Sequence, residues 1–378
     1  MRVGIDAHFL GRNKGGVETC VLGLIRALAG FDRENEYILY VGNPDFLCQA
    51  NMPPNFTMRI LPVVNPWLER ALLIPRMYVK DRLDVIHVQR ALPFWGCRHS
   101  VVQIHDAYYK THPDLFPFWK RFLLNPVFQW SGEKATKVVT VSQQSKEEIV
   151  RHYHIDPMKI EVVPNGVDLD VFSPVADKDL LLKTSQKFGI ANPFVIYLGA
   201  IERHKNVHVL IQAFQMFKRI CPDFSLVIVG SWPRESRRGY RRELLSLMER
   251  LGCRSNVIFT GYVVDEERRL LLNAAKMLVL PSRAEGFGLP PLEAMACGIP
   301  TITASIPVMQ EIYGDAALMV EPGNVEALAD AMKRLATDEP LAKEKVQRGF
   351  EVVKQYSWKR VAHRMTEVYR SALCQERS

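Results

Sequence analysis

The chain has 378 residues, 48% of them hydrophobic and 24% charged, and its formal net charge is +8. This length suggests two domains, and the composition is that of a soluble globular protein, which excludes a fibrous or a disordered chain. The seven cysteines are scattered without a CxxC pair, so we expect neither a disulfide framework nor a zinc site, and a reducing cytoplasm fits.

Short apolar runs that predict buried strands alternate with amphipathic stretches that predict helices along the whole chain. Such alternation is typical of parallel sheets with helices on both faces. The expected strands are residues 2–6, 37–41, 58–61, 85–88, 101–105, 137–141 and 160–163 in the first half, and 194–198, 225–229, 257–260, 277–280, 300–303 and 317–320 in the second. The clearest helical patterns are residues 17–29, 207–217, 266–275 and 358–373.

These elements predict an α/β fold of two Rossmann-like, doubly wound domains that face each other across a cleft. We assign residues 1–172 to the first domain and 173–357 to the second, followed by a C-terminal segment, 358–378. The stretch 172–192 lacks strand signals and contains a charge-rich helix, so we place the interdomain linker there. Parallel sheets bind ligands beyond the carboxyl ends of their strands, which predicts a site in the cleft.

The distribution of apolar and basic residues bears on location and partners. No apolar run approaches the roughly 20 residues that span a bilayer, and the first residues read as a strand rather than a signal peptide. We therefore expect a cytoplasmic protein. A solvated helix face explains the arginine cluster of the second half better than nucleic-acid binding, which we do not expect. That cluster is Arg234, Arg237, Arg238, Arg241 and Arg242.

The most informative segment is residues 281–300, PSRAEGFGLPPLEAMACGIP. It follows a predicted strand, and Pro290, Pro291 and the later Gly298 suit the start and the end of a helix. The N-terminus of that helix offers backbone N–H groups and partial positive charge to a phosphate. The residues expected to approach the phosphate are Gly286, Phe287, Gly288 and Leu289.

Two carboxylates flank this phosphate cradle. Glu285 lies in the loop and can face a ligand, whereas Glu293, eight residues later, is placed in the first turn of the helix and can reach hydroxyl groups. Acids for hydroxyls and backbone N–H groups for a diphosphate indicate a sugar nucleotide. The alternative is a plain turn in which Glu293 only complements the helix dipole.

Together with other segments, this motif resembles the retaining family 4 glycosyltransferases, which have the GT-B fold. The resemblance covers nearly all of the chain. It rests on GGVE (15–18), QIHD (103–106), VVPNGVD (162–168), YLGAIERHKN (197–206), FTGYV (259–263) and the segment EGFGLPPLEAMACGIP (285–300). The family implies transfer of a sugar from a nucleotide-diphosphate donor to an acceptor, with retained anomeric configuration and without a bound metal or other cofactor. It also implies that the last helix packs back on the first domain.

The resemblance implies donor-binding roles for residues of the second half. Lys205 matches the lysine that binds the diphosphate, and Arg203 can add a forked contact to the same oxygens. Glu285 matches the glutamate that contacts the donor sugar, and Glu293 the one that binds the ribose. The chain departs from many relatives at Ala200, where they carry arginine, so the role of Arg203 is less firmly implied than that of Lys205.

In the first half, the resemblance implies that His105 lines the sugar site and that Asp106 orients the acceptor hydroxyl or accepts its proton. His105 also has a plainer interpretation, as a polar group that is satisfied at a strand end. Gly15 and Gly16 allow close backbone approach to the donor phosphate or the acceptor. A strand-to-helix turn is the alternative for these glycines.

The donor, the acceptor and the membrane are expectations of a coarser kind. The IERHKN variant favours GDP-mannose, with UDP-hexoses as the other option. We expect a glycan or polyprenyl-diphosphate-linked acceptor in surface polysaccharide synthesis. Residues 67–82 and 116–137 mix aromatic and basic side chains. Either they pack on the core, or they bind an anionic membrane peripherally at its inner face. A GT-B sugar-nucleotide epimerase and a non-catalytic nucleotide-sugar-binding subunit are the rival functions.

Overall fold

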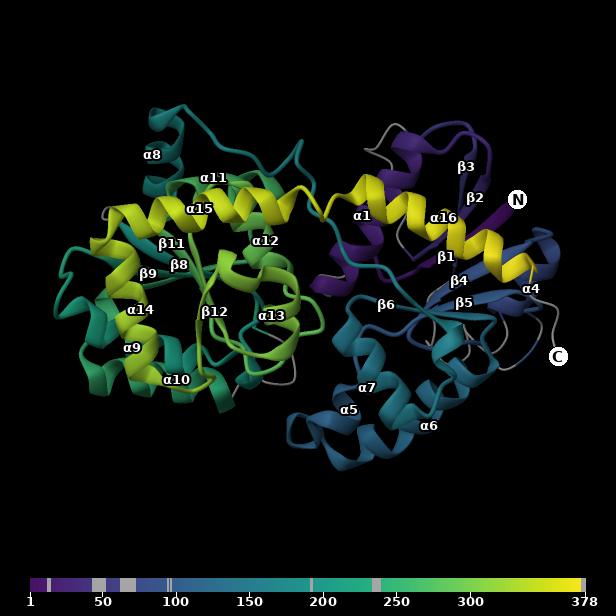
Figure 1. Cartoon of the computed structure of the whole chain (residues 1–378), viewed down its shortest axis with the longest axis horizontal. Coiled ribbons are helices and arrows are strands. Elements are labelled where there is room, and N and C mark those ends of the chain that lie inside the picture. The colour runs from purple at the N-terminus through teal and green to yellow at the C-terminus, as the bar shows by residue number, and fades with distance from the viewer. Residues whose placement is uncertain are drawn as a thin grey trace. The chain divides into compact units, whose positions relative to one another are not determined.

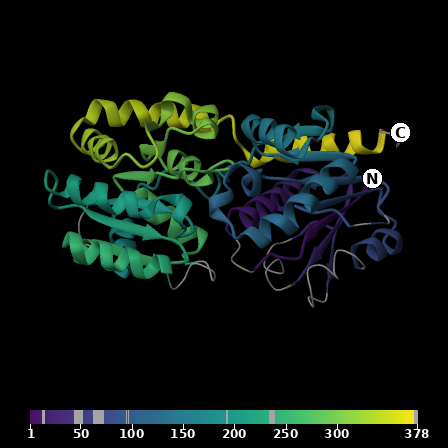
Figure 2. The same ribbon diagram turned by 90° about the horizontal axis from the view of Figure 1, so that it is seen from below.

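The computed structural model of the chain describes residues 1–11, 15–42, 52–61, 73–93, 95, 97–190, 193–232 and 239–374. It divides into two compact units, Met1–Gly166 with Trp358–Ser378, and Val167–Ser357 (Figure 1). Each unit is a parallel sheet with helices packed on it, which confirms the predicted fold class (Figure 2). Residues 67–72 of the first predicted aromatic and basic stretch lie outside the described residues, as do Arg234, Arg237 and Arg238.

The first unit contains a seven-stranded parallel sheet in the order β3-β2-β1-β4-β5-β6-β7. Its strands are β1 (Arg2–Ala7), β2 (Glu36–Val41), β3 (Phe56–Ile60), β4 (Val85–Gln89), β5 (Ser100–Gln103), β6 (Lys137–Thr140) and β7 (Ile160–Val162). Its α-helices are α1 (Gly16–Phe31), α4 (Ile74–Lys80), α5 (Tyr108–Thr111), α6 (Phe118–Lys134), α7 (Gln143–Tyr153) and α16 (Trp358–Cys374).

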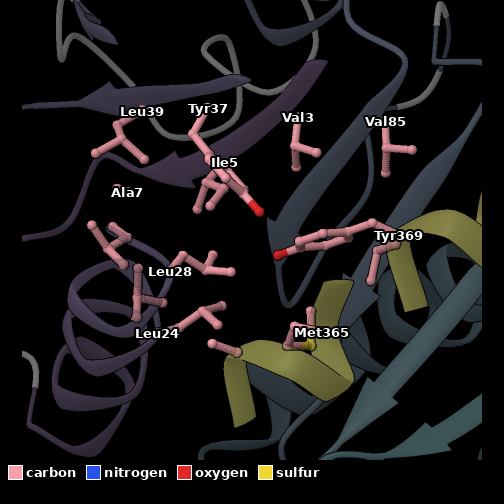
Figure 3. Close-up of a cluster of buried hydrophobic side chains, with 14 of the residues drawn as sticks. Val3, Ile5, Ala7, Leu24, Leu28, Tyr37, Leu39, Val85, Met365 and Tyr369 are labelled. Atoms are coloured by element: carbon pink, nitrogen blue, oxygen red, sulfur yellow. The ribbon is translucent and has the colours of Figure 1, made fainter. Parts of the chain in front are cut away.

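Both faces of this sheet are buried, because side chains alternate between two separate cores. In β2, Tyr37 and Leu39 enter a core formed with α1 and α16, whereas Ile38 and Tyr40 enter the core on the other face. Figure 3 shows Met365 and Tyr369 projecting from α16 into the first core. The closing helix therefore completes the fold of the first unit, since it packs against α1 and the sheet.

The second unit contains a six-stranded parallel sheet in the order β10-β9-β8-β11-β12-β13. Its strands are β8 (Phe194–Leu198), β9 (Ser225–Val229), β10 (Val257–Gly261), β11 (Met277–Leu280), β12 (Thr301–Ala304) and β13 (Leu318–Val320). Its α-helices are α8 (Lys178–Lys187), α9 (Val207–Lys218), α10 (Gly239–Leu251), α11 (Asp265–Ala274), α12 (Leu289–Ala296), α13 (Pro307–Tyr313), α14 (Val325–Thr337) and α15 (Glu339–Val353).

The structure differs from the sequence prediction in two places that bear on organisation. The second unit begins at Val167, before the predicted boundary at residue 172, because the N–H of Val167 donates to the carbonyl of Tyr356 at 2.9 Å. The predicted linker is also part of this unit: α8 packs on α11, and the side chain of Asn273 bonds to the backbone at Val175, 2.7 Å away. The absence of strand signals around a short polar helix was a poor indication of a linker, because such a helix can still pack on its neighbours through a small apolar face.

Candidate active site

The strand order of the second sheet reverses between β8 and β11. Strands β9 and β10 lie on one side of β8, and β11, β12 and β13 follow on the other. Loops that leave the carboxyl ends of two such strands diverge, and doubly wound sheets bind ligands at this point. The two loops here are residues 199–206 and 281–288, which contain Lys205 and Glu285.

Two hydrogen bonds fasten these loops to each other. The amide of Asn206 donates to the carbonyl of Pro281 at 3.0 Å, and the N–H of Arg283 donates to the carbonyl of His204 at 2.8 Å. Asn206 has a left-handed backbone with φ of 53°, which asparagine tolerates better than most residues. It ends the 3₁₀ turn Arg203–Lys205 and begins α9. The position of Lys205 is therefore set by the neighbouring loop.

Lys205 and Glu285 form an ion pair at the centre of this region. The Nζ of Lys205 lies 2.5 Å from Oε1 of Glu285, and the side chains are only 17% and 10% exposed. A charged pair with little access to water holds more tightly than a surface pair. A diphosphate that binds Lys205 must therefore compete with Glu285 for the ammonium group.

Arg203 is placed differently. Its guanidinium makes a forked pair with Glu243, Nη2 to Oε2 at 2.5 Å and Nη1 to Oε1 at 3.3 Å, and lies 5.0 Å from the ring centroid of Tyr240. The side chain is 62% exposed. Water competes for an exposed guanidinium, so its contribution to anion binding is expected to be weaker than that of Lys205.

The start of α12 offers fewer donors than the motif suggested. Pro290 and Pro291 are the second and third residues of the helix, so of its first three residues only Leu289 has an N–H. Gly288 precedes the helix with φ of 83°, and a Cβ there would lie 2.5 Å from Cε of Met309. A phosphate here would depend on the N–H groups of Leu289 and of the loop before it.

Phe287 fixes that loop from inside the unit. Its ring is buried, with 4% exposed, and packs edge-on against Tyr356 with centroids 5.7 Å apart. The hydroxyl of Tyr313 also donates to the carbonyl of Gly288. These contacts hold the backbone of Gly286, Phe287 and Gly288 in one conformation, as an anion-binding loop requires.

Glu293 is not in the first turn of α12, where the sequence analysis placed it. The helix begins at Leu289, so Glu293 is its fifth residue and is 4% exposed. Its Oε1 lies 3.2 Å from Nη2 of Arg268, which also donates to Asp265 at 2.9 Å. Burial raises the pKa of Glu293 to about 7, although Arg268 opposes the shift. The carboxylate is thus held by a partner that the sequence analysis missed.

In the first unit, Gly15 and Gly16 stand at the start of α1. Gly15 has φ of 65° and ψ of −136°, which glycine alone adopts readily, and among the described residues that are not its chain neighbours no atom lies within 4 Å of where its Cβ would be. The side chain of Glu18, in the first turn, accepts a hydrogen bond from the N–H of Gly11 at 2.6 Å. The turn into α1 therefore favours glycine at position 15.

His105 and Asp106 follow β5, which ends at Gln103 and not at His105 as predicted. Oδ1 of Asp106 accepts the N–H of Tyr108 at 3.0 Å, a bond that turns the chain into α5 and explains why the strand ends early. Nε2 of His105 lies 3.2 Å from Oε1 of Gln89. Burial lowers the pKa of His105 to about 3, with further contributions from Arg90 and His87, so the imidazole is neutral at neutral pH.

The predicted residues thus lie near the carboxyl ends of the strands in each unit. Arg203 is largely exposed to solvent, and Glu293 is buried one helical turn into α12. The sequence analysis missed Gln89, His87 and Arg268. His87 and Gln89 did carry a signal, because a histidine and a glutamine at alternate positions interrupt the apolar strand VIHVQ. Arg268 carried none, since it looks like any other charged residue of an amphipathic helix.

Comparisons with known proteins agree with this architecture. The model of the family "Glycosyltransferase Family 4" matches residues 14–171, and that of "Glycosyl transferases group 1" matches residues 183–370. O-antigen chain mannosyltransferase B of Escherichia coli is 29% identical over 299 residues, 78% of this chain and 73% of that protein. The serotype-specific mannosyltransferase WbdA of Escherichia coli is 29% identical over 252 residues. The matched residues are 65% of this chain and 30% of WbdA.

Among solved structures, HepE from Anabaena in complex with UDP-glucose has a TM-score of 0.79 at 19% identity, covering 98% of this chain and 100% of that one. The protein is therefore a glycosyltransferase of GT-B fold. Within that class, the chain belongs to family 4, the glycosyl transferases group 1. This assignment favours neither the epimerase nor the non-catalytic subunit that the sequence left open.

Proposed function

We propose that the protein transfers a hexose, with mannose favoured, from a nucleotide-diphosphate sugar to a glycan or lipid-linked acceptor, with retention of anomeric configuration. The observation that carries the proposal is the Lys205–Glu285 pair at the strand reversal of the second sheet. A cation for a diphosphate and a carboxylate for sugar hydroxyls stand side by side there. Relatives named as O-antigen mannosyltransferases support mannose and a polysaccharide acceptor.

Each residue has a proposed task. Lys205 and the N–H groups before α12 bind the diphosphate and stabilise the charge that grows on it as the glycosidic bond breaks, without a metal or another cofactor. Glu285 accepts hydrogen bonds from the donor sugar, and Glu293 accepts them from the ribose. His105 lines the sugar site, and Asp106 orients the acceptor hydroxyl or accepts its proton.

The donor is the part of the proposal that an experiment can decide first. GDP-mannose is favoured and UDP-hexoses are the alternative, because HepE is solved with UDP-glucose. A ligand that binds only the folded state raises the melting temperature by mass action, so a panel of GDP, UDP, ADP and dTDP identifies the base. Release of the nucleoside diphosphate from the matching sugar is then measured with and without lipid and glycan extracts. Release that needs no acceptor, or no release at all, would overturn transfer.

We also propose that α6 binds the first unit peripherally to the anionic inner face of the cell membrane. Four large apolar side chains near its start are unusually exposed: Phe118 by 74%, Trp119 by 60%, Phe122 by 70% and Leu123 by 52%. They lie on neighbouring turns, with Lys120 5.5 Å from the ring of Trp119. Aromatic and basic groups together suit a headgroup interface. No helix in the described part of the chain is long and apolar enough to cross a membrane.

The membrane proposal is tested with vesicles of anionic and of zwitterionic lipid at low salt. Co-sedimentation with anionic vesicles should be lost when Phe118 and Phe122 are both replaced by serine. Met158 is 78% exposed elsewhere on the same unit, so Met158→Ser is the matched control and should bind like the wild type. Equal sedimentation of the double variant, or none by the wild type, contradicts the proposal.

A further inference from the structure

The carboxyl ends of β4 and β5 hold a connected row of buried polar side chains. His87 is fully buried, and Gln89 and Gln103 are 2% and 7% exposed. In a parallel sheet that is covered on both faces, such positions are ordinarily apolar, because an unsatisfied polar group there costs about 1–3 kcal/mol. Hydrogen bonds link the members of the row, so each member restricts the orientation of the next.

The orientation of the Gln89 amide follows from its neighbours. Its Nε2 lies 3.2 Å from Oε1 of Gln103 and 3.4 Å from Nε2 of His87. In the structure the amide of Gln89 turns its NH₂ group toward the oxygen of Gln103, and its Oε1 points to His105. On its far side, His87 is bonded through Nδ1 to the hydroxyl of Tyr369 at 2.9 Å. Figure 3 shows Tyr369 reaching the strands from α16.

The backbone holds Gln89 in place. The next residue, Arg90, has φ of 69°, which is uncommon for a residue with a Cβ, and its N–H donates to the carbonyl of Gln103 at 2.9 Å. The β4–β5 pairing therefore continues past the end of β4 at the expense of backbone strain. Strain of this kind persists only where the surroundings enforce one geometry.

We propose that Gln89 is a positioning residue that fixes the ring proton of His105 on Nε2, so that Nδ1 accepts a hydrogen bond from a hydroxyl of the donor sugar. A carbonyl oxygen has no proton to give, so the nitrogen 3.2 Å from Oε1 of Gln89 must carry the hydrogen. A neutral imidazole has one N–H, which leaves a lone pair on Nδ1. Nδ1 has no hydrogen-bond partner in the described part of the chain.

This inference rests on the proposed place of His105 in the sugar site, and it changes the role of the ring there. The sequence analysis places the histidine in the sugar site without saying which hydrogen bonds its ring makes there, whereas the row of amides selects the acceptor role for Nδ1. A histidine with an unfixed proton would present a lone pair at Nδ1 only part of the time. Gln89 keeps the lone pair on Nδ1 of His105 at all times, although Gln89 itself does not contact the substrate.

The direct test is the nitrogen NMR spectrum of the ring-labelled, ligand-free protein, in which the two neutral tautomers of histidine differ clearly. Comparison with His105→Gln identifies the signals of His105. The wild type should show a protonated Nε2, and Gln89→Leu should show a mixture of tautomers. Tyr369→Phe is the matched control, because it removes only the bond to His87, while the oxygen of Gln103 still orients the Gln89 amide, so the His105 signals should stay unchanged. A protonated Nδ1 in the wild type overturns the proposal.

The kinetic test uses the nucleotide sugar and the nucleoside diphosphate in parallel. Loss of one hydrogen bond should raise the KM for the sugar nucleotide by about three- to tenfold in Gln89→Leu. The Kd for the diphosphate, which lacks the sugar, should stay the same. Gln89→Glu keeps an oxygen toward His105 and should recover much of the loss, which separates positioning from misfolding. Equal KM values in Gln89→Leu and wild type contradict the inference, whereas absence of transfer in the wild type contradicts the proposed function alone.

Discussion

Replacing Glu285 by glutamine should tighten binding of the nucleoside diphosphate while it impairs transfer. In the structure, Oε1 of Glu285 and Nζ of Lys205 are 2.5 Å apart and have little access to water. A diphosphate must break this contact to reach Lys205, so part of its binding free energy is spent on the exchange. Glutamine removes the opposing charge and leaves the ammonium group available.

The size of the effect follows from the energy of the contact. A hydrogen bond between charged groups contributes about 1.5–3 kcal/mol net, equivalent to roughly ten- to a hundredfold in Kd. Glutamine still offers a neutral carbonyl to Lys205, and both side chains retain some exposure, 17% and 10%. We therefore expect the lower limit, a Kd for the diphosphate about tenfold smaller than in the wild type.

Isothermal titration with the preferred nucleoside diphosphate measures this directly, and melting temperatures with and without it give a second readout. Without ligand, Glu285→Gln should melt below the wild type, because Lys205 loses its partner, and the ligand should raise its melting temperature by more. Glu243→Gln is the matched control, since its partner Arg203 is 62% exposed, and should change the Kd little. An unchanged or weaker Kd in Glu285→Gln would refute the reasoning.

Three further predictions concern the second unit. Lys205→Met should weaken binding of the diphosphate by roughly ten- to a hundredfold, and Arg203→Met by less than about threefold, as measured by titration. Because the pKa of Glu293 is raised from 4.5 to about 7, the wild type should lose stability as pH rises through this window, and melting curves of Glu293→Gln should lack that loss. Gly288→Ala should lower the melting temperature, because its Cβ would lie 2.5 Å from Met309, and Met309→Ala should relieve only the steric part. Full stability of Gly288→Ala would contradict the positive φ at this position.

Each strand of the described residues overlaps a predicted one, and the central strands were the clearest, because a strand buried on both faces is a continuous apolar run. The ends of the strands and helices were predicted less accurately. Strand β5 stops at Gln103 because the side chain of Asp106 bonds to the N–H of Tyr108, and an apolar pattern does not record such a turn. The start of α12 at Leu289 likewise moved Glu293 out of the first turn.

Contacts between distant residues could not be predicted from local patterns. Lys205 and Glu285 are 80 residues apart, and they meet because β8 and β11 are neighbours in the sheet. The resemblance to a family supplied their roles but not their pairing with each other. His87 and Gln89 were visible as polar residues in an apolar strand, yet the sequence alone did not say that Gln89 faces His105.

The two carboxylates of the proposed donor site share one property that bears on turnover. Glu285 is paired with Lys205, and Glu293 with Arg268, so each acid has a cation of the chain beside it. Binding of a sugar nucleotide is then an exchange of partners, and its affinity reflects the difference between two sets of contacts.

The consequence of this exchange is largest after transfer, when the sugar that engaged Glu285 has left and the diphosphate is still bound to Lys205. Glu285 is then available to take Lys205 back, which should hasten release of the product. We therefore expect the diphosphate to dissociate about tenfold more slowly from Glu285→Gln in a stopped-flow displacement measurement, because affinity changes within one site are mostly changes in dissociation rate. A faster association with an unchanged dissociation rate would show that Glu285 shields Lys205 without displacing the product.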